Sequence, residues 1–181
     1  RHVVLALPPR LAGGLRHEPA LPADVVQTLA EVPTWMAGQA KFVAVYDHPF
    51  WRDEGLSGDA ISRRGPLVEI HDASGQGGDP AAVFGLVGVP APHRAGQASQ
   101  IAAAALAQLT RIFGPAAAKP RYTTLRDWAF DPETATQADH TPPNGHPAYG
   151  LPVALTRLAG GRLHFGATET APEMGGFLEG A

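Results

Sequence analysis

A succession of β-rich runs between residues 40 and 88 constrains the fold of this chain more than any other feature. The runs lie at residues 40–47, 58–64, 66–74 and 81–88, and they are separated by glycine, proline and aspartate. No helical pattern intervenes, and strands joined without helices usually form an antiparallel sheet or meander. The sequence therefore predicts an α+β fold with a mostly antiparallel mixed sheet flanked by helices.

Apolar periodicity predicts two helices. The longer one is expected at residues 97–114, where one face carries the apolar stripe Ile101, Ala105, Leu109 and Ile112. Gly114, followed by Pro115, ends this helix. A shorter helix is expected at residues 21–33, with Pro22 at its first position.

The remaining segments are shorter or irregular. Three further strands are expected at residues 3–9, 121–130 and 161–167, and a helix is expected to begin in residues 175–181. Residues 131–150 form a polar segment rich in proline and glycine. Loops of this length inside a compact domain are usually functional or disordered, so we expect no regular structure there.

The composition excludes several classes of function. The chain has 181 residues and a net charge of −3, so it lacks the basic character of a nucleic-acid-binding protein. No apolar run reaches about 18 residues, the length that a membrane-spanning helix requires, and we expect a cytoplasmic protein. The absence of cysteine excludes disulfides, thiolate metal ligands and a cysteinyl bond to a cofactor.

Two other classes of site find no support. Asp139, His140 and His146 share the long loop, but their spacing matches no zinc-binding pattern. We therefore expect no metal site and expect these histidines to be solvated. The nucleophile motif G-x-S-x-G does not occur, which excludes an α/β-hydrolase.

Three stretches carry a family resemblance. The first is the apolar strand that ends in Pro8 and Pro9 and precedes the predicted helix at residues 21–33; in the second, Lys41 lies ten residues before Trp51 of a Pro-Phe-Trp sequence. The third, GATETAPEMGGFLEGA at residues 166–181, contains Thr-Glu-Thr and then a Gly-aromatic-apolar-acid-Gly-Ala sequence. Together they resemble the flavin-dependent amine oxidase family, which includes monoamine and polyamine oxidases.

The resemblance implies a protein of two parts. One part is a dinucleotide-binding domain that opens with G-x-G-x-x-G, and the other is a substrate domain of antiparallel sheet and helices. No G-x-G-x-x-G occurs in this sequence. We therefore expect residues 1–160 to form the substrate-binding domain and residues 161–181 to be a C-terminal piece of the FAD-binding domain. Its N-terminal part, with the pyrophosphate-binding turn, is then a missing partner, and we expect the chain alone to be inactive.

The resemblance also assigns roles to individual residues. Lys41 is implied to be catalytic, because a cation near flavin N5 positions water or dioxygen and stabilises negative charge. The implied FAD-binding residues are Thr168, Glu169, Thr170, Gly176, Phe177, Leu178 and Trp128. Phe177 and Tyr149 are implied to contact the amine substrate.

Structural interpretations compete with these assignments. A strand lysine such as Lys41 usually points to solvent, and a Thr-Glu-Thr turn can cap a helix without any ligand. Phe177 and Trp128 can equally be packing residues of a core.

The sequence also departs from the family pattern. Gln137 and Ala138 stand where monoamine oxidases carry a cysteine and a tyrosine, and Met174 replaces a usual tryptophan. The flavin is therefore not thioether-linked through this loop, and one ring, Phe177, remains of a two-ring cage unless Tyr149 contributes. We expect an FAD-dependent amine oxidoreductase that passes a hydride to flavin and is reoxidised by dioxygen. A non-catalytic binding module, or a flavin oxidoreductase acting on a non-amine substrate, stays open as an alternative.

Overall fold

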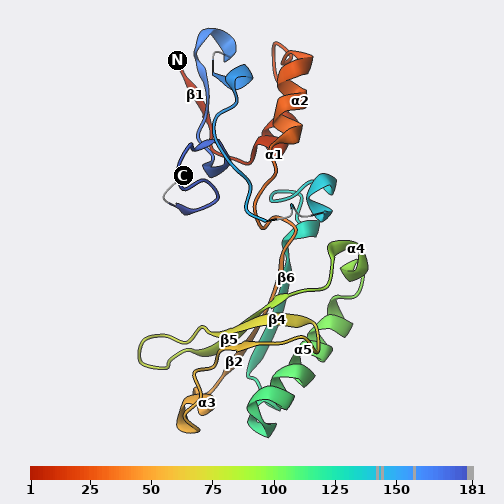
Figure 1. The fold of residues 1–181 in the computed structure, drawn as a ribbon, viewed down its shortest axis with the longest axis vertical. Helices are drawn as coiled ribbons and strands as arrows, with labels where there is room; N and C mark the ends of the chain where they lie inside the picture. The colour runs from red at the N-terminus through yellow and green to blue at the C-terminus, as the bar shows by residue number, and fades with distance from the viewer. Residues whose placement is uncertain (142, 144, 157, 179–181) are drawn as a thin grey trace. The chain divides into compact units, whose positions relative to one another are not determined.

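The computed structural model describes residues 1–141, 143, 145–156 and 158–178 (Figure 1). The chain forms two compact units: the first unit comprises residues 1–38 and 128–181, and the second unit comprises residues 39–127. The expected division after residue 160 therefore falls inside the first unit. The assignment of substrate and cofactor roles to the two sides of that division stays a prediction.

The second unit contains a five-stranded sheet. Its strands are β2 (Ala40–Tyr46), β3 (Ala60–Ile61), β4 (Leu67–Asp72), β5 (Ala81–Val87) and β6 (Tyr122–Asp127). They are arranged in the order β3-β4-β5-β2-β6, and every neighbouring pair is antiparallel. The α+β fold with a mostly antiparallel sheet is thus confirmed.

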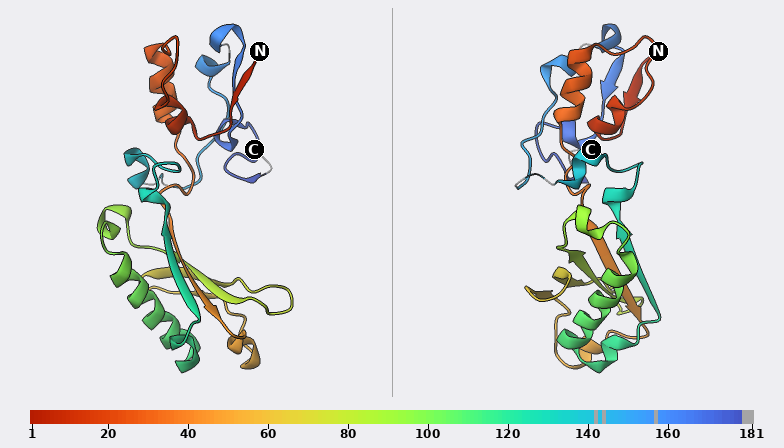
Figure 2. Two further views of the ribbon diagram at one scale, coloured as in Figure 1. Left: turned by 180° about the vertical axis from the view of Figure 1, so that it is seen from behind. Right: turned by 90° about the vertical axis from the view of Figure 1, so that its right-hand side faces the viewer.

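Helix α5 (Ala98–Phe113) packs on one face of this sheet, as Figures 1 and 2 show from three directions. The predicted apolar stripe is buried there, with Ile112 partly exposed at its margin. Strand β2 alternates between the two faces of the sheet, as a strand must. Phe42 and its even-numbered neighbours are buried in the core, so Lys41 lies on the face away from α5.

A buried amide joins α5 to the irregular end of β4. The register between β4 and β5 shifts between Leu67 and Glu69. Gln108 is fully buried, and its Oε1 accepts a hydrogen bond from the Leu67 N–H at 2.8 Å. Its Nε2 donates to the Leu67 carbonyl at 2.7 Å. One side chain therefore bonds both backbone groups of a core residue beside a bulge, where the regular ladder is disturbed.

Two short helices lie outside the helices that the sequence predicted. Helix α3 (Phe50–Asp53) follows β2, and helix α4 (Ala91–Arg94) precedes α5. Trp51 of α3 is fully buried, and its Nε1 donates a hydrogen bond of 2.8 Å to Asp72. Packing of an aromatic side chain into the core thus decides the backbone form that the local glycine and proline pattern left open.

The first unit is built around a parallel pair of strands. Strand β1 (Val3–Leu5) pairs with β7 (Leu163–Phe165), and helices α1 (Pro9–Gly13) and α2 (Ala23–Glu31) follow β1. Both strands are shorter than the predicted segments at residues 3–9 and 161–167, and α1 already begins at Pro9, inside the first of these segments. Pro22 is the residue before the first turn of α2 and not its first helical residue.

Several 3-10 helices lie in the rest of the chain. They are η1 (Pro115–Ala118), η2 (Trp128–Phe130), η3 (Gln137–His140), η4 (Val153–Leu155), η5 (Leu158–Gly160) and η6 (Thr168–Thr170). Strand β6 therefore ends at Asp127, before the predicted end at residue 130, and η3 lies within the long loop. Of the helix expected at residues 175–181, residues 175–177 form a turn and a bend, Leu178 has a 3-10 helical conformation, and residues 179–181 lie outside the described part.

No helix among the described residues has both the length and the apolar character needed to cross a bilayer.

Candidate functional site

The turn after β7 is closed by a threonine hydroxyl. Thr168 Oγ1 accepts a hydrogen bond from the Gly176 N–H at 2.9 Å and donates one to the Phe177 carbonyl at 2.7 Å. The predicted cofactor residues at the two ends of this segment are thereby brought together. Because both contacts are internal, the hydroxyl of Thr168 orders the turn itself.

The two residues that follow Thr168 point inward. Glu169 and Thr170 are buried, and the Thr170 hydroxyl donates to the Ala167 carbonyl at 2.7 Å. Burial raises the pKa of Glu169, and the carboxylate of Asp139 raises it further. Glu169 is therefore an interior carboxyl group of the first unit, whereas Phe177 and Leu178, at the other end of the turn, are exposed.

Paired glycines let the turn approach two aromatic side chains. A Cβ atom on Gly175 would lie 2.6 Å from Tyr149 Cβ, and one on Gly176 would lie 2.8 Å from His146 Nε2. Gly176 also has a φ of +83°, a conformation that side chains other than glycine rarely adopt. The local need for glycine thus comes from contact with the 145–150 segment.

His146 is the residue of this site that the sequence did not reveal. Its ring stacks on Phe177 with centroids 5.2 Å apart and planes 12° apart. It also meets Tyr149 edge-on at 5.6 Å and Trp35 at 5.0 Å. His146 is exposed, as expected for a loop histidine, but its ring contacts were not predicted; its position three residues before Tyr149 is the one sequence signal that could have suggested them.

Tyr149 is fixed by its hydroxyl group. The hydroxyl donates to the Pro33 carbonyl and accepts from the Trp35 N–H, both at 2.8 Å. Burial raises the pKa of Tyr149 to about 12. The phenol is therefore occupied by backbone contacts, and its ring, held beside Gly175 and His146, is the part that faces the turn.

The long loop is anchored by an ion pair. Buried Asp139 pairs with Arg10 of α1, and its other oxygen accepts from the N–H and hydroxyl of Thr136. Ala138 and Gln137, next to it, are exposed. Trp128 is half-buried at the start of η2. Whether Trp128 contacts a flavin stays a prediction.

Lys41 belongs to the second unit. Its Nζ lies 4.4 Å from the centroid of the Phe84 ring on β5, a cation–π distance. The Phe84 ring also contacts His71, whose ring centroid lies 5.2 Å from that of Phe84. Lys41 is thus held on the sheet face away from α5, and its catalytic role stays a prediction.

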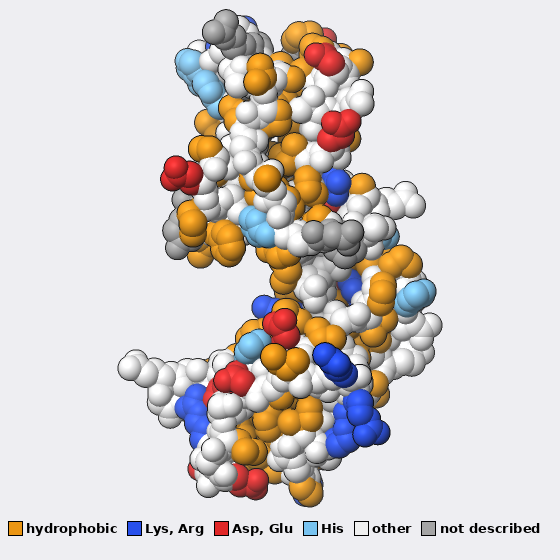
Figure 3. Space-filling view, in the orientation of Figure 1, with side chains coloured by type: hydrophobic (Ala, Val, Ile, Leu, Met, Phe, Trp, Pro, Cys, Tyr) orange, Lys and Arg blue, Asp and Glu red, His pale blue; other side chains and the backbone are white. Residues whose placement is uncertain are grey.

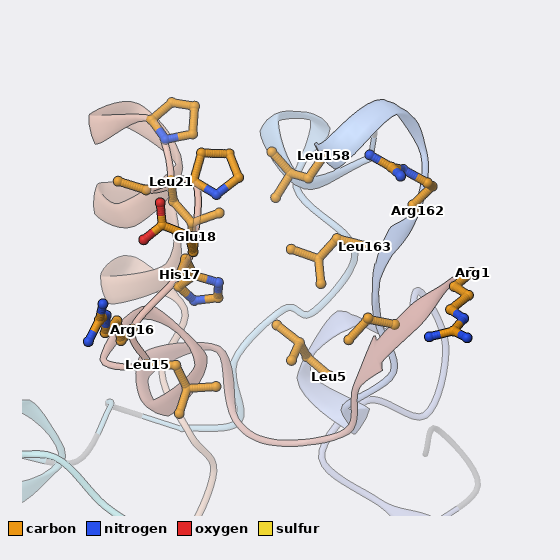
Figure 4. Close-up of a pocket in the computed structure, with 14 residues that line it drawn as sticks. Arg1, Leu5, Leu15, Arg16, His17, Glu18, Leu21, Leu158, Arg162 and Leu163 are labelled. Carbon is orange, nitrogen blue, oxygen red and sulfur yellow. The ribbon is translucent and has the colours of Figure 1, made fainter.

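A cleft in the first unit contains none of the predicted site residues. It has a volume of about 740 Å³ and lies between the β1–β7 pair and the segment that joins α1 to α2 (Figure 4). Leucines from both sides point into it, and charged side chains stand at its margin: Arg1, Arg16, Glu18 and Arg162. Among the described residues, no group of three His, Cys, Asp or Glu side chains is placed to hold a metal ion.

Sequence comparisons identify relatives along the whole chain. The family described as flavin containing amine oxidoreductase matches residues 1–181. A probable flavin-containing monoamine oxidase A of Dictyostelium discoideum is 30% identical over 100% of this chain and 39% of its own length. An L-amino acid dehydrogenase of Synechocystis is 28% identical over 100% of this chain and 38% of its own length. The chain therefore spans about two fifths of the length of these relatives.

Solved structures agree with the sequence relatives. Cyclohexylamine oxidase from Brevibacterium oxydans is 28% identical, with a TM-score of 0.75 over 99% of this chain and 40% of that protein. A putrescine oxidase, at 24% identity, has a TM-score of 0.72 over 99% of this chain and 39% of that protein, which supports the fold alone. The α+β arrangement is thus one that amine oxidases contain.

Proposed function

The chain belongs to the family of flavin-containing amine oxidoreductases, and from this premise we propose that it is part of an FAD-dependent enzyme that oxidises the C–N bond of an amine. The observation that carries the proposal is the 168–177 turn. It follows strand β7 directly, it is closed by Thr168, and it presents an exposed aromatic ring, Phe177. A flavin needs such a rigid edge, with backbone groups and apolar surface, beside its ring system.

The turn fits a flavin in its apolar part. Phe177 is 50% exposed and Leu178 is 90% exposed, so both offer surface for a flat ring. The hydroxyl groups of Thr168 and Thr170 form hydrogen bonds with backbone atoms of the turn itself. The polar contacts to the cofactor would therefore come from backbone atoms. The chain has no cysteine, so it supplies no thioether bond. When bound, the flavin accepts the hydride equivalent from the carbon next to the substrate nitrogen.

The parallel pair β1–β7 supports the proposal that a further cofactor domain completes the first unit. Parallel sheets are normally buried on both faces, and two strands alone are marginally stable. Val3 and Val4 are nevertheless more than half exposed, and Figure 3 shows apolar side chains on the surface of this unit. We expect strands of the FAD-binding domain to cover them.

Lys41 is the residue of the second unit to which we assign chemistry. A side-chain ammonium group held over a ring is fixed in position, and a fixed cation stabilises charge that develops during oxidation or oxygen reduction. Its neighbours in the sheet register are Leu86 on one side and Arg126 on the other. In this proposal Lys41 positions a water molecule or dioxygen beside the cofactor.

The full-length protein provides the test. We expect purified protein to show flavin absorbance, and a panel of amines, polyamines and amino acids to bleach it under anaerobic conditions. Peroxide released on admission of air would identify dioxygen as the acceptor, whereas bleaching without peroxide would identify a dehydrogenase. Protein that lacks flavin, or flavin that no amine reduces, contradicts the proposal. Flavin that no amine reduces would favour the alternative of a binding module without turnover. That alternative is suggested by Ala138, which stands where the family pattern has an aromatic ring. Residues 1–181 alone are expected to bind no flavin.

A further inference from the structure

We propose that His146 is a positioning residue that fixes the ring of Phe177 and thereby sets the affinity of the site for amines. The inference rests on the proposed function, in which Phe177 faces the substrate. His146 lies outside the three stretches that carry the family resemblance. Three independent features of the first unit support it.

The first feature is the stack itself. His146 and Phe177 lie nearly parallel, with centroids 5.2 Å apart and an angle of 12° between their planes. An offset stack of this kind stabilises one ring orientation by about 0.5–1.5 kcal/mol beyond the buried area. One face of Phe177 is thus occupied by the imidazole, and only its other face and its edges remain for a substrate.

The second feature is the rigid support of the histidine. Trp35 and Tyr149 contact the His146 ring from two further directions, at 5.0 and 5.6 Å. Tyr149 is itself tied to the backbone of residues 33–35 by two hydrogen bonds of 2.8 Å. The imidazole is therefore held by a chain of contacts that ends in the main chain of another segment.

The third feature is the backbone beneath the stack. Gly176 approaches His146 so closely that an added Cβ would lie 2.8 Å from Nε2. Met174, two residues earlier, has a φ of +52°, which is uncommon for a residue with a side chain. The 174–177 segment thus adopts a special conformation at the place where it meets the imidazole.

The consequence for binding follows from the lost second ring. Ala138 stands where the resemblance leads one to expect a tyrosine, and it is exposed. In a site with a single aromatic ring, substrate binding depends on the orientation of that ring, because no second ring on the opposite side holds the substrate in place. If the His146 stack is removed, Phe177 can rotate, and part of the binding free energy must then be used to order it.

The test compares His146→Ala, His146→Phe and the matched control His93→Ala, an exposed histidine of the second unit, in the full-length protein. The binding probe is tert-butylamine, which has no hydrogen on the carbon next to nitrogen and so cannot be oxidised there. Calorimetry measures its Kd, and steady-state kinetics with the best substrate of the amine panel measure KM and kcat.

We expect His146→Ala to raise both Kd and KM by about three- to tenfold, the equivalent of one aromatic stack, with kcat within about twofold. His146→Phe should restore both values, because it keeps the ring, and His93→Ala should change neither. Unchanged binding in His146→Ala, failure of His146→Phe to restore it, or a fall in kcat with loss of flavin would overturn the inference. If the wild-type protein oxidises no amine, the proposed function fails, while the Kd values still decide the role of His146.

Discussion

The hydroxyl of Thr168 bonds the backbone of Gly176 and Phe177, eight and nine residues further along the chain. Thr168→Val removes both contacts at nearly constant volume. We expect it to lower the free energy of unfolding by about 1 kcal/mol, and to weaken flavin binding in the full-length protein, because the turn is no longer closed. Urea unfolding followed by tryptophan fluorescence measures the first effect. Thr168→Ser keeps the hydroxyl and should behave as wild type; equal losses in both variants would contradict this interpretation.

Lys41 has a matched control in the only other lysine of the chain, exposed Lys119. Lys41→Met removes the cation that lies over Phe84. We expect the rate of oxidation of the reduced flavin by dioxygen to fall by about tenfold or more, because a preorganised positive charge is lost. Stopped-flow absorbance measures this rate. Lys119→Met should leave it unchanged, and an unaffected rate in Lys41→Met would assign that lysine a packing role.

Gln108→Ala leaves both backbone groups of Leu67 without their buried partner. The variant should lose about 2–4 kcal/mol of stability, since it combines two unsatisfied buried groups with a cavity. Urea unfolding measures the loss. Gln100→Ala makes the same substitution at an exposed position of the same helix and should change stability by less than about 0.5 kcal/mol. A small effect at both positions would show that water replaces the amide.

Glu169 makes stability depend on pH. Burial raises its pKa in the folded protein above the usual 4.5, so the folded protein binds this proton more tightly than the unfolded chain does. Its contribution to stability is therefore greatest below pH 4.5 and is lost as the pH rises through the folded pKa. Glu169→Gln should gain stability relative to wild type between pH 4 and pH 8 in thermal unfolding. Glu173→Gln, at an exposed position of the same segment, should show no such gain.

Asp72 affects the pH dependence of stability in the opposite direction to Glu169. Burial alone would raise its pKa, but hydrogen bonds from Arg52, Ser74 and Trp51 outweigh burial and lower the pKa far below its usual value of 3.8. The carboxylate thus contributes stability above pH 3.8, which is lost as the pH falls toward the folded pKa. Asp72→Asn should cost about 2–3 kcal/mol at pH 7, and less below pH 3.8.

Denaturant unfolding at pH 7 and pH 3 measures this difference. Asp53→Asn, at an exposed site of the same region, is the control and should cost less than about 0.5 kcal/mol. An Asp72→Asn cost that is the same at both pH values would contradict an ionised anchor.

Sequence reasoning predicted the fold where the signal is periodic. The four β-rich runs became neighbours in one sheet, and the stripe of α5 was found buried, because alternation and helical spacing are consequences of local geometry alone. Helix α3 was missed because its four residues carry no period. Packing of Trp51 into the core stabilises the helical form of that segment, and this contact cannot be predicted from the local sequence pattern.

The sequence by itself determined the family, the order of the strands along the chain and which face of each element is apolar. Only the tertiary structure decided which partners meet: the parallel pairing of β1 with β7 across about 160 residues, the amide of Gln108 on Leu67, and the stack of His146 on Phe177. The physical reason is that such contacts depend on where the chain returns in space. Residue type and local spacing fix the surface that each element offers, and the packing of the whole unit fixes what covers it.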